Sequence, residues 1–177
     1  MRRANVPEQP MSHYEDVVIE YLRADRSLFL NTQCCIQLHP GDNPDTSGPH
    51  WYCDAVACDM ELEAVFLVEI TYSVSLSSLT KRLREWSENW PELKAALVRN
   101  CHIPDDWPVT PWLFVPHKKR ELIGAQLDQM SKGGTLAFGE PIITSLEDVQ
   151  PWKYRSWNRN DKPNRLCASA TNKKHNP

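Results

Sequence analysis

Two carboxylates stand in the most apolar part of this chain. Glu69 lies inside the run 65–70, which reads VFLVEI, and Asp54 lies in the preceding hydrophobic segment. Such runs are usually buried on both faces of a sheet, where an ionised carboxylate costs several kcal/mol unless it is paired or binds a metal. A divalent cation shared by both side chains is the simplest compensation, because Mg²⁺ and similar hard cations prefer oxygen ligands. The two acids therefore predict a metal-dependent hydrolase.

The elements around these acids follow from hydrophobic periodicity. Residues 51–58 and 64–72 read as strands joined by a turn, and alternation along the second strand places Glu69 and Thr71 on the same face. Residues 13–24 read as a helix with Ser12 as its N-cap. Glu15 lies within about 60° of the apolar stripe of this helix and so faces the core side. Alternatively, Glu15 serves only as the acidic partner of a capping box with Ser12.

The remaining pattern predicts further strands at 28–38, 109–115 and 141–144, and helices at 75–90, 91–98 and 121–130. The order of helix, three strands, helix, strand and helix predicts an α/β sandwich with a mixed central sheet flanked by helices. The length suits a single domain at 13–150, with a flexible N-terminus at 1–12 and a basic C-terminal tail at 151–177.

The acids and their order resemble the PD-(D/E)XK nuclease superfamily, which has the restriction-endonuclease-like fold. The resemblance covers about residues 13–116, and the matching segments are 15–22 (EDVVIEYL), 51–57 (WYCDAVA) and 66–71 (FLVEIT). It implies phosphodiester hydrolysis of DNA, with Mg²⁺ or Mn²⁺ as the cofactor. It also implies that Asp54 and Glu69 are metal ligands, that Ile70 lends its carbonyl oxygen, and that Glu15 is an outer-shell or second-metal acid. Folds of this kind often pair as dimers, although this sequence shows no dimer signal.

The chain departs from the family pattern at Thr71, where the family has a lysine. Lys81 and Arg82 on the following helix are the first candidates to supply the missing cation, because related families carry this lysine there. Lys118 and Lys119, which follow the strand at 109–115, are the second candidates. Alternatively, Lys81 belongs to the solvated face of an amphipathic helix. Loss of the lysine also leaves open a catalytically degenerate fold that binds nucleic acid or a protein partner.

Charge is distributed unevenly, although the formal net charge is only −3. Residues 40–70 carry seven acids and no Lys or Arg, whereas residues 151–177 carry seven Lys or Arg and one acid. An acidic centre with a basic flank suits a metal site that a polyanion approaches, although a basic tail can also be simply solvated. Aromatic residues interleave with the basic ones, so we expect contacts with DNA from Trp152, Lys153, Arg155 and Trp157. We also expect Lys118 and Lys119 to contact the DNA.

Six cysteines accompany a sequence with no apolar leader and no apolar run of membrane-spanning length. We therefore expect a soluble, cytoplasmic protein with reduced thiols. A zinc-stabilised interaction module is a third alternative, and His50, Cys53 and Cys58 are its best candidate ligands.

Overall fold

The computed structural model describes residues 13–38, 50–73, 75–134 and 136–154, and the account below concerns these residues. The predicted cap Ser12 and two predicted DNA contacts, Arg155 and Trp157, lie outside them.

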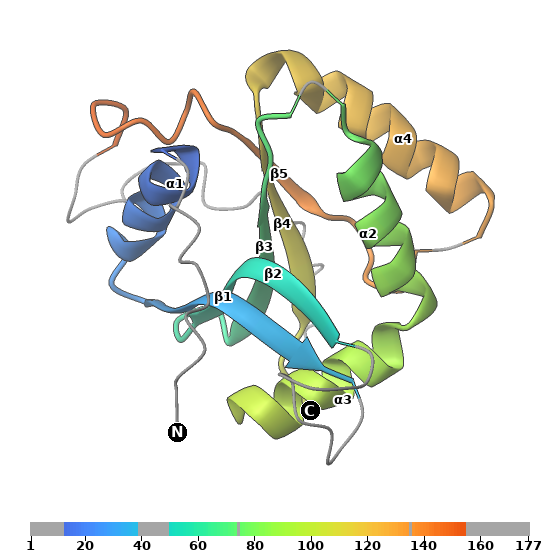
Figure 1. Cartoon of the computed structure of the whole chain (residues 1–177). Helices are drawn as coiled ribbons and strands as arrows, with labels where there is room; N and C mark the ends of the chain where they lie inside the picture. Colours follow the sequence, from blue (N-terminus) through green and yellow to red (C-terminus); the bar gives the residue numbers. More distant parts are fainter. Residues whose placement is uncertain (1–12, 39–49, 74, 135, 155–177) are drawn as a thin grey trace, which may run out of the picture.

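A five-stranded mixed sheet forms the centre of the molecule (Figure 1). Its strands lie side by side in sequence order, and they are β1 (Leu28–Gln37), β2 (His50–Asp59), β3 (Ala64–Ile70), β4 (Val109–Val115) and β5 (Ile142–Ser145). Strand β2 runs antiparallel to both β1 and β3, whereas β3, β4 and β5 are parallel to one another. The predicted α/β sandwich with a mixed sheet is therefore confirmed, as is the order of its elements.

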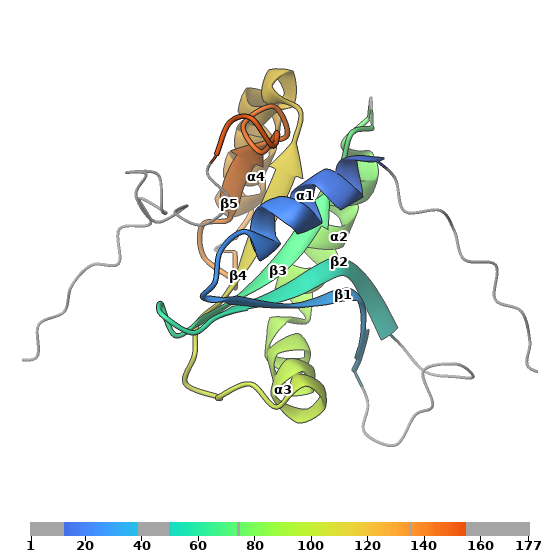
Figure 2. The same ribbon diagram turned by 90° about the vertical axis from the view of Figure 1, so that its left-hand side faces the viewer.

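Helices cover both faces of this sheet (Figure 2). One face carries α1 (His13–Arg23), and the other carries α2 (Ser77–Glu88), α3 (Trp90–Cys101) and α4 (Arg120–Lys132). The break predicted near Trp90 falls at Asn89, and Pro91 occupies the first turn of α3, where its missing N–H is not needed. A short 3₁₀ helix, η1 (His117–Lys119), was not predicted.

Each face of the sheet has its own apolar core. Val65 and Leu67 of β3 pack with the side chains of α2, α3 and α4, while Phe66 and Val68 pack with α1. This alternation confirms the predicted two-faced burial of β3, and it directs Glu69 toward the α2 layer.

The ribbon of β1 and β2 twists from one layer to the other. Ala55 and Ala57 of β2 belong to the core beneath α1, but Cys53, which has the same parity, belongs to the opposite core. Cys34, the cross-strand partner of Cys53, makes the same change of layer. Because residues two apart share a face in a flat strand, the ribbon must turn over near Asp54.

Three tryptophans are buried, namely Trp86, Trp90 and Trp112. The indole N–H of Trp112 donates to the Thr144 hydroxyl at 2.8 Å and so links β4 to β5. Among the described helices, none has the length and apolar character needed to cross a membrane.

Candidate functional site

The site is built where β3 ends, from side chains that four elements contribute. Asp54 comes from β2, Glu69 from β3, Arg82 from α2 and Glu15 from α1. Their charges act on one another, since Glu15 and Arg82 both influence Asp54, and Asp54 influences Glu69. The fold therefore brings Asp54 and Glu69 near each other, with Glu15 near Asp54.

The Asp54 side chain supplies a hydrogen-bond acceptor where the pairing of β2 with β3 ends. Regular pairing between β2 and β3 ends at Ala55 and Val68, one residue before Asp54. The Ile70 N–H would then lack a strand partner, but it donates to Asp54 Oδ2 at 2.6 Å. This bond continues the sheet through a side chain and holds the Asp54 carboxylate beside the end of β3.

Glu69 is the most deeply buried of these acids, with 4% of its surface exposed. The Arg82 guanidinium donates a charge-assisted hydrogen bond to Glu69 Oε2. The other oxygen, Oε1, is buried and has no hydrogen-bond partner among the described residues. A buried carboxylate oxygen without a partner is costly, which marks this atom as a place where a ligand would be stabilising.

Burial and mutual repulsion keep both acids from ionising readily. Burial raises the pKa of Glu69 to about 8, the negative charge of Asp54 adds to this rise, and Arg82 opposes it. The pKa of Asp54 is also raised, first by burial and also by Glu15, while the Ile70 N–H and Arg82 oppose the rise. A cation between the two carboxylates would relieve both effects.

Glu15 stands at the start of α1, partly buried. Its neighbour Tyr14 stacks on Tyr72, the second residue after β3, with ring centroids 5.2 Å apart. This stack connects the first turn of α1 with the end of β3, so that Glu15 comes close enough to raise the pKa of Asp54.

Lys81, one of the first candidates for a cation at the site, does not contact Glu69. The Lys81 side chain is 77% exposed and forms a weak pair with Glu85 at 3.7 Å. Arg82 makes the contact with Glu69 instead. Helical geometry gives the reason, because at 100° per residue Arg82 lies about 60° from the buried Leu79, whereas Lys81 lies on the far side of the helix. The spacing in the sequence thus contained the signal that favours Arg82.

Thr71 does not offer a cation to the site. Its backbone N–H donates to the Phe114 carbonyl of β4 at 2.9 Å, and its hydroxyl accepts a hydrogen bond from the Ser73 N–H at 3.4 Å. The hydroxyl therefore takes part in the turn that follows β3.

The predicted nucleic-acid contacts lie on two segments. Lys118 and Lys119 belong to η1, directly after β4. Because β3 and β4 are parallel, η1 lies at the same end of the sheet as Thr71, which follows β3. Lys118 is exposed and Lys119 half-buried. Lys153 is also exposed, beside Trp152, whose side chain is 77% exposed.

Among the described residues, no group of three or more His, Cys, Asp or Glu side chains is arranged to hold a metal ion. The zinc ligands considered above are therefore not gathered. Cys53 instead lies against Cys34, to whose carbonyl oxygen its thiol donates at 3.8 Å. A two-carboxylate site such as that of Asp54 and Glu69 needs fewer side chains, because Mg²⁺ is commonly bound by one or two carboxylates, waters and substrate phosphates.

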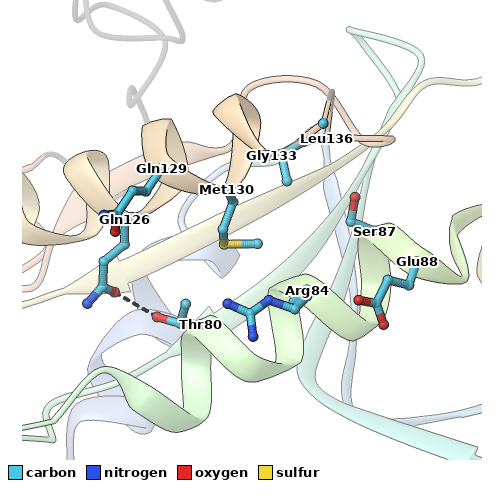
Figure 3. Close-up of a pocket in the computed structure, with 10 residues that line it drawn as sticks. Thr80, Arg84, Ser87, Glu88, Gln126, Gln129, Met130, Gly133 and Leu136 are labelled. Carbon is cyan, nitrogen blue, oxygen red and sulfur yellow. Dashed lines mark hydrogen bonds between the residues drawn. The ribbon is translucent and has the colours of Figure 1, made fainter.

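A separate pocket of about 600 Å³ lies between α2 and α4 (Figure 3). Arg84, Gln126 and Met130 are among its lining residues, and a hydrogen bond of 2.6 Å from Thr80 to Gln126 joins the two helices there. The acids at the end of β3 do not line it.

Comparisons with protein-family models, with curated proteins and with solved structures find no match to this chain. The case for a function therefore depends on the chemistry of the residues described above.

Proposed function

We propose that this chain is a divalent-metal-dependent phosphodiesterase that acts on DNA and has the restriction-endonuclease-like fold. The observation that carries the proposal is the unpartnered Oε1 of Glu69, buried at the end of β3 beside the carboxylate of Asp54. The order of the elements, with the acids on the first helix and on the second and third strands, is also the order that the family resemblance leads us to expect.

The residues present suit a hard cation. Asp54 and Glu69 would hold Mg²⁺ or Mn²⁺, with the Ile70 carbonyl as a third oxygen and Glu15 acting from outside. When bound, such an ion acidifies an attacking water and shields the charge that develops on a phosphate. The Asp54 carboxylate is also held in a fixed orientation without a ligand, because it accepts a hydrogen bond from the Ile70 N–H.

Arg82 takes only part of the role of the missing lysine. A guanidinium stays protonated at any physiological pH, so Arg82 cannot accept a proton from water. It can stabilise negative charge on a phosphate and hold Glu69 in one orientation. We infer that Arg82 positions the carboxylate and offsets charge at the site.

The ion pair between Arg82 and Glu69 also favours a second function. Arg82 already neutralises part of the charge of Glu69 without a metal, and Thr71 supplies no cation. A catalytically degenerate fold of this type would bind nucleic acid or a protein partner through the same edge without cleaving it.

Cleavage assays test the enzyme directly. Purified protein is incubated with Mg²⁺ or Mn²⁺ and with duplex, branched and single-stranded DNA, in parallel with Asp54→Asn and Glu69→Gln variants. The matched control is Asp59→Asn, which alters another buried acid on β2 that only caps the following turn. We expect cleavage by the wild type and the control and none by the two site variants. If the wild type leaves every substrate intact, the enzyme proposal fails.

Calorimetric titration with Mg²⁺ or Mn²⁺ separates the two functions. Binding that is lost in Glu69→Gln supports a metal-dependent enzyme. A wild-type protein that binds DNA or a protein but no metal supports the degenerate fold.

A further inference from the structure

Two tyrosines stand exposed beside the acid site. Tyr14 immediately precedes Glu15 on α1, and Tyr72 immediately follows Thr71 after β3. Their rings are stacked, with centroids 5.2 Å apart and planes inclined by 25°. Even so, 41% of Tyr14 and 53% of Tyr72 remains exposed. The stacked pair therefore leaves an aromatic surface open to solvent next to the acid site.

The end of the sheet that carries these tyrosines also carries basic side chains. In Figures 1 and 2, the first turn of α1, the connection from β3 to α2 and the connection from β4 to α4 all lie at this end. The connection after β4 contains the consecutive residues His117, Lys118 and Lys119. An aromatic pair and a basic segment thus flank the buried acids.

We propose that Tyr14 and Tyr72 form a stacking platform for an unpaired nucleobase, so that the nucleic acid bound at this site is single-stranded or locally unpaired. The inference deepens the proposed function and rests on it. Exposed aromatic rings beside basic side chains are the combination that binds single strands, with bases stacked on the rings and phosphates near the positive charges. Bases within a duplex are already stacked on one another, and reaching a platform would first require them to be unpaired.

Fluorescence anisotropy tests the platform with a labelled oligothymidylate and a labelled duplex of the same length. The titrations are done in EDTA, so that metal-dependent cleavage does not interfere. We expect the single strand to bind more tightly than the duplex. A stacked base contributes about 1–3 kcal/mol, so Tyr14→Ala and Tyr72→Ala should each weaken single-strand binding by roughly 5-fold to 160-fold.

Two further variants separate stacking from an effect on folding. Tyr72→Phe keeps the aromatic face and should bind like the wild type. Tyr52→Ala removes a tyrosine of β2 with a similar exposed fraction, 55%, and should also bind like the wild type. In addition, photo-crosslinking with a bromouracil-containing strand should label the peptides that contain Tyr14 or Tyr72.

The outcomes distinguish this inference from the proposed function. Binding that prefers the duplex, or that is unchanged in both alanine variants, overturns the platform even if the protein cleaves DNA. Tyrosine-dependent binding of single strands without cleavage supports the platform and refutes the phosphodiesterase. A protein that binds no nucleic acid in these titrations overturns the platform, whereas the cleavage assay with Mg²⁺ or Mn²⁺ decides the phosphodiesterase separately.

Discussion

The buried carboxyl of Glu69 should make the stability of this protein fall as the pH rises. Its pKa is about 8 in the folded protein, compared with 4.5 for an unperturbed glutamate. Between these values the folded state holds a proton that the unfolded state has released, so each increase in pH favours unfolding. The stabilisation is complete below pH 4.5 and is lost as the pH approaches 8.

The size of this effect follows from the difference in pKa. One pKa unit corresponds to about 1.4 kcal/mol, so the full shift sets an upper limit of roughly 5 kcal/mol. Because Glu69 is almost completely buried, we expect a loss of stability on the order of 3–5 kcal/mol between pH 5 and pH 8.5. Glu69→Gln cannot ionise, and it should be close to the wild type in stability at pH 5 and more stable than the wild type at pH 8.5.

Urea unfolding followed by tryptophan fluorescence measures this difference. Trp86 is fully buried and reports on the core around α2. Free energies of unfolding are determined at several values of pH for the wild type and for Glu69→Gln, and the difference between them is plotted against pH. A difference that stays constant from pH 5 to pH 8.5 would refute the reasoning, because it would mean that Arg82 keeps Glu69 ionised throughout this range.

Three further predictions concern the same site. Asp54→Ala leaves the Ile70 N–H without its acceptor and should lower the free energy of unfolding by about 1–3 kcal/mol in urea titrations, with Asp54→Asn causing a smaller loss. Arg82→Met removes the cation that opposes the rise of the Glu69 pKa, so Glu69 should stay protonated at pH 8.5 and the loss of stability should be larger there than at pH 5 by about 1 kcal/mol. Lys81→Met should change stability by less than about 0.5 kcal/mol at either pH, as expected for an exposed pair. Mg²⁺ binding at pH 7 should release protons, because the cation displaces the proton of Glu69; calorimetry in buffers of different ionisation enthalpy measures this release, and a buffer-independent heat would contradict it.

The regular elements around the site were predictable because their signals are local. The strand at 109–115 was predicted with the bounds that β4 has, and the buried face of α2 was visible in the spacing of Leu79, Leu83 and Trp86. The limits of other elements shifted by one to three residues, as at the end of β3, where the contact of Asp54 with Ile70 replaces strand pairing. A side chain that takes over a backbone partner leaves no periodic trace in a sequence.

The sequence by itself determined that Glu69 would be buried, because an uninterrupted apolar strand is covered on both faces of its sheet. Only the tertiary structure decided which groups meet it. The twist of the β1–β2 ribbon brings Asp54 to the end of β3. The orientation of α2 about its axis directs Arg82, and not Lys81, toward Glu69. The packing of α1 places Tyr14 against Tyr72. These choices depend on contacts between residues far apart in the chain, and such contacts form only when the layers pack together.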